Sequence, residues 1–150
     1  KTILTLILSC CCLWAFGDNK TFSKLAEVNK CWAEQKDLPQ LPAYTILGER
    51  EWIKLHLSLV EQTLRARDVS TLTAAQKQNR GKSLNDLHQY WQSGRFPVND
   101  AYAYRTPIFI DKYDNFCAVG YLVKASGHEA VSRTIAANTN LAYVRQINYP

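Results

Sequence analysis

The densest cluster of residues able to perform chemistry lies within residues 99–128, where Arg105, Asp111, Cys117 and His128 occur. Cys117 stands at the start of a segment that favours a short helix, and a thiol at a helix N-terminus is stabilised as the nucleophilic thiolate. His128 could then act as the base, with Asp111 or Asn99 orienting its imidazole. This set predicts a cysteine hydrolase or transferase. The alternative, which we favour, is that Cys117 is a small buried side chain or half of a disulfide and that His128 only begins a helix.

The cysteines also allow a purely structural interpretation. Cys31 and Cys117 are the two cysteines outside the apolar N-terminal segment. In an oxidising compartment they could form a disulfide, which would stabilise the fold by about 4 kcal/mol in the chain-entropy model, whereas two free thiols are the alternative. The cysteines and histidines show none of the short spacings of structural zinc sites, so we expect no metal site, and nothing in the sequence indicates a cofactor.

A second group of candidate residues is suited to binding. Aromatic and basic side chains interleave over residues 88–105, namely His88, Tyr90, Trp91, Arg95, Tyr102, Tyr104 and Arg105. Such a mixture can stack on bases or on sugar rings, and in an exported protein a sugar is the more reasonable ligand, so we expect no nucleic-acid partner. A glycan-binding module that uses Asn99, Tyr102, Tyr104 and Arg105 is therefore a further alternative. The simpler interpretation is that these rings pack the core and the loop.

The elements that position these residues are predicted to be mostly helical. Apolar residues recur at helical spacing over residues 21–36, 49–67 and 128–137, and a further helix is predicted over residues 74–93, whose second half carries such a stripe. Thr73 and Gln76 fit a capping box for the third of these helices, and Gly94 would end it. Its residues 76–83 are all polar, so this half should be solvated, and Gly81 could break it.

One segment favours extended structure. The run Ile108-Phe109-Ile110 predicts a strand, and residues 111–115 read as a turn, which gives a small β-hairpin near residues 107–117. Residues 117–124 could be its return strand or a short helix, and we favour the helix; a short tail helix is expected over residues 141–147. The predicted fold class is mostly α (α+β), a compact helical domain with this hairpin.

The N-terminus has the pattern of an export signal. Lys1 is followed by the apolar stretch 2–16, and Ala15-Phe16-Gly17 fits a signal-peptidase site, so residues 1–17 are predicted to be a cleavable signal peptide and residues 18–150 a single globular domain. The stretch is shorter than the roughly 20 apolar residues of a spanning helix, and no later segment is apolar enough to cross a membrane. Lipid anchoring at Cys10 is less favoured, because the apolar run continues past it. The expected location is periplasmic or secreted.

The charge of the chain is mildly basic. Eighteen Lys and Arg residues stand against 13 Asp and Glu, a net charge of +5. This excess would draw an exported domain weakly towards anionic envelope glycans, and another envelope protein is an alternative partner. Screening by salt makes this a bias towards such partners and not a binding site.

Four motifs, in this order, carry a family resemblance. They are FPVN at 96–99, RTPIFID at 105–111, CAVGYL at 117–122 and SGHE at 126–129. Over roughly residues 72–147 the chain resembles a family of uncharacterised exported bacterial proteins, common in Bacteroidota, that share FPxN, RxPxFID, CAVGYL and SGHE motifs. The resemblance implies an envelope or secreted location but no activity. The family often has glycine where this chain has Asp114, and we expect Asn115 to take the left-handed conformation in that turn.

Three functions follow from these observations. The leading hypothesis is an envelope or secreted domain without catalytic activity that binds a partner or has a structural role. The first alternative is the cysteine hydrolase or transferase with Cys117 as nucleophile, and the second is the glycan-binding module.

Overall fold

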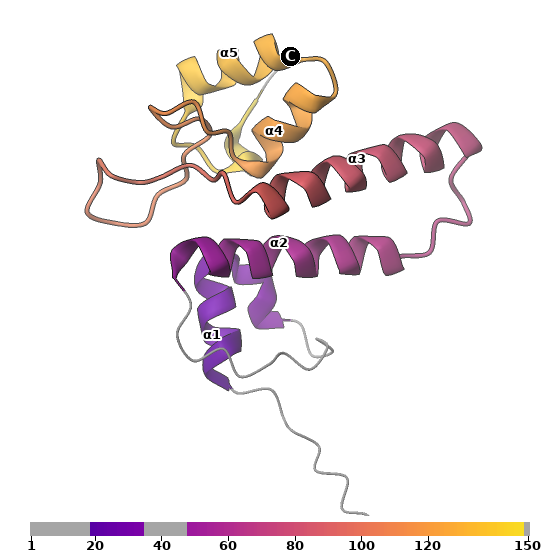
Figure 1. Cartoon of the computed structure of the whole chain (residues 1–150), viewed down its shortest axis with the longest axis horizontal. Helices are drawn as coiled ribbons and strands as arrows, with labels where there is room; N and C mark the ends of the chain where they lie inside the picture. The colour runs from indigo at the N-terminus through magenta and orange to yellow at the C-terminus, as the bar shows by residue number, and fades with distance from the viewer. Residues whose placement is uncertain (1–18, 35–47, 149–150) are drawn as a thin grey trace, which may run out of the picture. The chain divides into compact units, whose positions relative to one another are not determined.

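The computed structural model describes residues 19–34 and 48–148. The chain divides into two compact units, Lys1–Ile46 and Leu47–Pro150, and each is described by itself. The fold is mostly helical, with five α-helices and two short 3-10 helices in the described ranges (Figure 1). The predicted signal peptide lies outside the described residues, and the single domain over residues 18–150 stays a prediction.

In the first unit, helix α1 (Asn19–Val28) is followed directly by the 3-10 helix η1 (Lys30–Glu34). Leu25 and Trp32 are buried in these two elements. The single helix predicted over residues 21–36 is wrong, because the chain is interrupted at Asn29. The side chain of Asn29 accepts a hydrogen bond from the amide of Cys31 at 3.0 Å, and such local bonds compete with the helical backbone pattern.

The second unit is built on two long helices that run antiparallel, α2 (Glu49–Ala66) and α3 (Ala74–Ser93) (Figure 1). Their predicted ranges are confirmed to within a residue. Leu57 of α2 packs with Leu87 and Tyr90 of α3 and with Phe96, which follows α3, to form the core. The core therefore comes from the apolar stripes that the sequence shows at helical spacing.

Helix α3 begins and continues as one unbroken element. The predicted capping box is confirmed, because the Gln76 amide donates to Thr73 Oγ1 at 3.3 Å and the Thr73 amide donates to Gln76 Oε1 at 2.9 Å. Most of the polar residues 76–83 are exposed, as predicted. The break considered at Gly81 is not present, since a glycine in a helix costs only about 1 kcal/mol relative to alanine.

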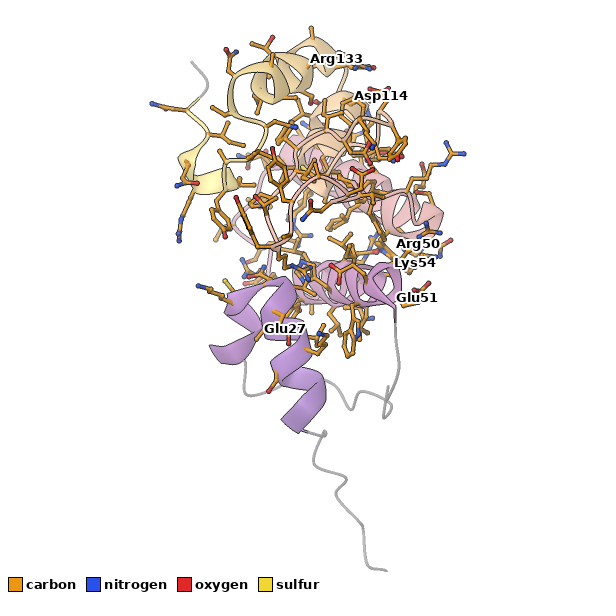
Figure 2. All side chains as sticks on the ribbon, turned by 90° about the vertical axis from the view of Figure 1, so that its left-hand side faces the viewer. Glu27, Arg50, Glu51, Lys54, Asp114 and Arg133 are labelled. Atoms are coloured by element: carbon orange, nitrogen blue, oxygen red, sulfur yellow. The ribbon has the colours of Figure 1, made fainter. Side chains whose placement is uncertain are left out.

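Gly94 ends α3 in the left-handed conformation, with φ of 65°. A Cβ atom at this position would lie 2.9 Å from Lys54 Cε, so the absence of a side chain also lets α2 approach. Lys54 and Arg50, which the hypothetical Cβ would face, lie close together on the first half of α2 (Figure 2). Both the backbone angle and the close approach require glycine here.

The C-terminal part adds α4 (Ala118–Ala125), α5 (Glu129–Thr139) and the 3-10 helix η2 (Val144–Gln146). Helix α4 packs on α3, and α5 packs on α4 (Figure 1). The fully buried Ser132 of α5 donates to the Gly120 carbonyl of α4 at 3.0 Å, and the Phe109 ring packs directly on Gly120. The choice of a helix over a strand after Cys117 is confirmed.

The predicted hairpin near residues 107–117 is not confirmed. In the described part of the chain this segment holds a single antiparallel bridge, between Ile110 and Phe116, and no sheet. The ladder does not continue because the chain enters α4 directly after Cys117, whose carbonyl accepts from the Tyr121 amide at 2.8 Å. Asn140, just after α5, bonds backbone groups of Phe109 and Ile110. The Phe109 amide donates to the Asn140 carbonyl at 2.9 Å, and the Asn140 side chain bonds the Ile110 amide and carbonyl at 2.8 and 3.0 Å.

None of the helices in the described ranges combines the length and the apolar character needed to cross a membrane.

Candidate functional site

Cys117 serves as the N-cap of α4. Its Sγ accepts a hydrogen bond from the Gly120 amide at 3.4 Å. Burial raises the pKa of the Cys117 thiol above its ordinary value, and this effect outweighs the opposing backbone N–H groups. The group is therefore a thiol at neutral pH and not a thiolate. Cys31 is exposed, and both cysteines are free thiols, so the predicted disulfide is not formed in the structure.

His128 lies at the other end of α4 from Cys117. The His128 amide donates to the Val123 carbonyl at 3.1 Å, beyond the C-terminal turn of α4. Because α4 has eight residues, about 12 Å of helix separates its two ends. His128 Nδ1 instead lies 3.1 Å from Ser126 Oγ. The structure thus does not bring the proposed nucleophile and base together.

Asp111 holds the backbone of the turn. Its buried carboxylate accepts hydrogen bonds from the amides of Val98, Tyr113 and Asn115 and from the Asn115 side chain, at 2.8 to 2.9 Å. Burial raises the pKa of Asp111, but these four donors outweigh it and hold the pKa below its ordinary value. Asp114, with φ of 64°, is the left-handed residue of the turn, so the expectation for Asn115 is wrong. Asp111 is engaged as a structural acceptor, and none of these four bonds comes from His128.

The predicted binding residues 99–105 come together in one exposed loop. Asn99 shapes this loop, because its side chain accepts from the Tyr102 amide at 3.0 Å and donates to the Tyr104 carbonyl at 2.7 Å. The rings of Tyr102 and Tyr104 are exposed, with centroids 6.0 Å apart. Arg105 forms an ion pair with Glu49 at 2.7 Å, so its charge is already neutralised.

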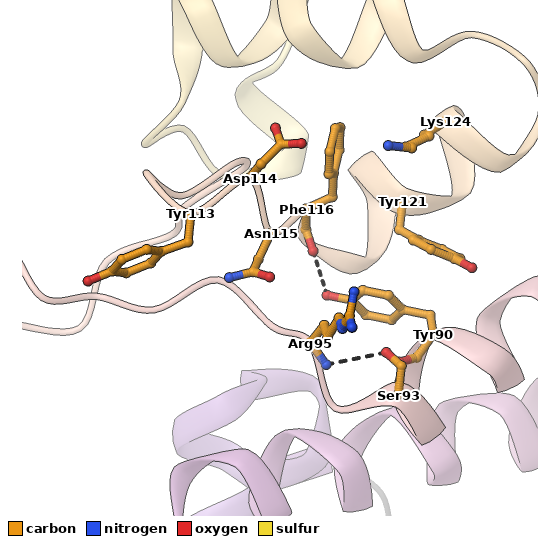
Figure 3. A pocket seen from close by; sticks show the side chains of 9 residues that line it. All are labelled: Tyr90, Ser93, Arg95, Tyr113, Asp114, Asn115, Phe116, Tyr121 and Lys124. Atoms are coloured by element: carbon orange, nitrogen blue, oxygen red, sulfur yellow. Dashed lines mark hydrogen bonds between the residues drawn. The ribbon is translucent and has the colours of Figure 1, made fainter.

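The second unit has a pocket of about 670 Å³ between the end of α3, the turn and α4. We call it the Arg95 pocket; its lining residues are Tyr90, Ser93, Arg95, Tyr113, Asp114, Asn115, Phe116, Tyr121 and Lys124. Figure 3 shows these side chains, with Tyr90 donating to the Phe116 carbonyl at 2.7 Å. The volume lies within the range of roughly 300–1,000 Å³ that is typical of small-molecule sites.

The rim of the Arg95 pocket carries an ion-pair network. Arg133 of α5 makes a two-pronged pair with Asp114 at 2.8 and 3.2 Å, and the two residues lie side by side in Figure 2. Glu129 bonds both Arg133 and Lys124, at 2.5 and 3.1 Å. The cations of Lys124 and Arg133 also lie over the Phe116 ring, 4.6 and 5.3 Å from its centroid. One edge of the pocket is therefore fixed by charge.

A second hollow, of about 480 Å³, contains the buried Glu61 of α2. Its carboxylate accepts from Arg65 Nε at 2.7 Å and Trp91 Nε1 at 2.6 Å, and it lies 3.0 Å from His88 Nδ1. Burial raises the pKa of Glu61, and the hydrogen bonds from Trp91, Arg65 and His88 reverse this and lower it. This carboxylate joins α2 to α3.

No group of three or more His, Cys, Asp or Glu side chains in the described ranges could hold a metal ion.

The sequence did not single out most of the Arg95 pocket. Tyr90 and Arg95 belong to the mixed aromatic and basic series, but Tyr113, Tyr121 and Lys124 were not selected. These three aromatic or basic residues all lie in or beside the sequence motifs that form the turn and α4, and this position is the signal by which they could have been found. Comparison with known proteins finds no matching family model, no matching curated protein and no matching solved structure.

Proposed function

We propose that this chain is an exported domain of the bacterial envelope that binds a small ligand without catalysing a reaction, and that the Arg95 pocket is its binding site. The observation that carries the proposal is the pocket itself, in which aromatic faces and the guanidinium of Arg95, which pairs with none of the described residues, line a hollow of ligand size. Its walls come from three separate elements, so the fold and the site form together.

The state of the reactive residues supports binding over catalysis. The Cys117 thiol is held in its protonated form and caps a helix. The carboxylate of Asp111 has its lone pairs occupied by four donors. A hydrolase would need a thiolate with a base within hydrogen-bond reach, and α4 separates Cys117 from His128.

The family resemblance agrees with this role. Its motifs supply residues that build the pocket's surroundings, including Phe96 in the core, Asp111 in the turn and Gly120 under Phe109. The glycine that the family often has at position 114 would suit the left-handed angle found there. We propose membership of that family and export by the signal peptide at residues 1–17.

The same proposal includes a role for the segment 107–117 and a class of partner. Residues 107–117 act as a rudimentary hairpin whose turn carries Tyr113 and Phe116 into the pocket wall. Anionic envelope glycans are the proposed partner class, in keeping with the net charge of +5.

A nuclear magnetic resonance titration tests the proposal. The ¹⁵N-labelled protein is titrated with a panel of neutral sugars, sugar acids, amino acids and nucleotides. We expect at least one class to shift the amides of Arg95, residues 113–116 and Tyr121 selectively. Shifts confined to the exposed loop at residues 99–105 would favour the glycan-binding alternative there, and a panel without any selective shift would contradict the proposal.

A further inference from the structure

Arg95 is the feature of the pocket that most restricts its ligand. Its guanidinium makes no hydrogen bond or ion pair within the described ranges, whereas its backbone amide donates to Ser93 Oγ at 3.3 Å. In Figure 3 the Arg95 side chain extends among the lining residues, beside Tyr90. A planar guanidinium presents paired N–H donors that match the two oxygens of a carboxylate.

The charges around the pocket leave a positive excess. The ion-pair network and Arg95 together hold three cations, Arg95, Lys124 and Arg133, and two anions, Asp114 and Glu129. Two further cations, Lys54 and Arg50 of α2, lie against Gly94, the residue before Arg95. The ion-pair network neutralises the charges of Lys124 and Arg133, but it does not include Arg95, whose charge stays uncompensated. This excess suits an anionic ligand, and the planar guanidinium of Arg95 matches the two oxygens of a carboxylate.

The other open groups of the pocket suit a hydroxylated ring. The Tyr121 hydroxyl has no partner in the described part of the chain. Asn115 uses its Nδ2 to donate to Asp111 at 2.9 Å, which leaves its Oδ1 as an acceptor. The Tyr113 side chain is 60% exposed and offers an aromatic face at the mouth of the pocket. One donor, one acceptor and one ring face thus accompany the guanidinium.

We propose that the Arg95 pocket binds a sugar acid, a pyranose with one carboxylate such as a uronic acid residue of a glycan. The carboxylate pairs with Arg95, the hydroxyls meet Tyr121 and Asn115, and one face of the sugar ring packs on Tyr113. This inference rests on the proposed function and names the class of ligand for the same site.

Titration calorimetry on the full chain tests the inference, with trigalacturonate as the probe. We expect binding that weakens with added salt, and neutral trigalactose and inorganic phosphate that bind at least tenfold more weakly. Galacturonate monomer shows whether the natural ligand is a free sugar acid or part of a polymer. Equal affinity per sugar for monomer and trimer indicates a free sugar acid, and tighter binding of the trimer indicates a polymer. Both results support the inference.

Two variants of equal charge assign the effect to Arg95. Arg95→Gln should weaken trigalacturonate binding about 10- to 100-fold, as expected for the loss of a charge-assisted bidentate pair. Arg67→Gln removes the same charge from an exposed arginine at the C-terminus of α2, and should leave affinity unchanged. Arg95→Lys should restore only part of the binding, because a lysine lacks the fork of donors.

Three outcomes would overturn the inference, and they differ in what they say about the site. Equal affinity for the neutral trimer, or tighter binding of phosphate, would refute the sugar acid but leave a binding pocket in place. An unchanged affinity in Arg95→Gln would refute the anchor. A pocket that responds to no ligand class in the magnetic resonance panel would refute the proposed function as well.

Discussion

Asp111 gives the sharpest test of how the turn is held. Its Oδ1 accepts from the amides of Tyr113 and Asn115, and its Oδ2 accepts from the Val98 amide and the Asn115 side chain. In Asp111→Asn the oxygen can keep the first two bonds, but the new NH₂ group faces two donors and loses the others. Asp111→Ala loses all four bonds.

The loss of stability in each variant follows from the number of hydrogen bonds that it loses. A hydrogen bond to a charged group contributes about 1.5–3 kcal/mol. Water can replace the carboxylate at the exposed Val98, so we use the lower value for each bond. The free energy of unfolding should fall by about 3 kcal/mol in Asp111→Asn, which loses two bonds, and by about 6 kcal/mol in Asp111→Ala, which loses four.

The pH dependence provides a second readout. Since the pKa of Asp111 is lowered in the folded chain, its contribution is complete above the unfolded value of about 3.9 and is lost as pH falls through the folded value. The difference in stability between wild type and Asp111→Ala should therefore shrink as the pH falls below about 4.

Urea unfolding followed by far-ultraviolet circular dichroism measures both effects. Asp86→Asn is the matched control, because Asp86 lies on α3 and its side chain makes no hydrogen bond within the described residues. It should change stability by less than about 0.5 kcal/mol. The reasoning is refuted if Asp111→Asn behaves like this control, or if it is as destabilising as Asp111→Ala.

Three further predictions concern packing, the interhelical carboxylate and the thiol. Gly120→Ala should lower the free energy of unfolding by about 1 kcal/mol, measured in urea, because its Cβ would lie 3.0 Å from the buried Phe109 ring. Gly81→Ala, whose Cβ would meet open space, should instead raise it by about 0.5–1 kcal/mol. Equal effects of the two substitutions would contradict this reasoning. Glu61→Gln should lower the free energy of unfolding by about 2 kcal/mol at pH 7 and by less in acid, because the pKa of Glu61 is lowered in the folded chain. A loss of stability that grows in acid would be inconsistent with that lowered pKa. Residue-resolved mass spectrometry should find Cys117 alkylated far more slowly at pH 7 than the exposed Cys31. Faster alkylation of Cys117 than of Cys31 would support Cys117 as a catalytic nucleophile.

Helix positions were predictable where local rules act alone. The apolar spacing of α2, the Thr73 capping box and the left-handed Gly94 depend on residues that are close in sequence, and the structure agrees with each. The interruption at Asn29 was missed because the apolar spacing continues across it. A side chain that bonds its own backbone changes the element without changing the pattern.

The candidate site was less predictable because it depends on partners distant in sequence. The sequence placed Asp111 in a turn, but its bond to the Val98 amide requires two segments to meet. Asn140 likewise bonds the backbone of Ile110 from thirty residues along the chain. The Arg95 pocket likewise joins α3, the turn and α4, and no local spacing marks such a meeting.

The bonds of Asn140 have a consequence for self-association. An unpaired strand offers a row of free amides and carbonyls on which another chain can add a strand, and this is a common route to aggregation. In the segment from Phe109 to Asp111 those groups are occupied on both sides, by Asn140 and by the Cys117 and Asn115 backbones. Residues 109–111 of the native protein therefore offer no template for an added strand, and detachment of Asn140 would free the groups of Phe109 and Ile110 that it bonds.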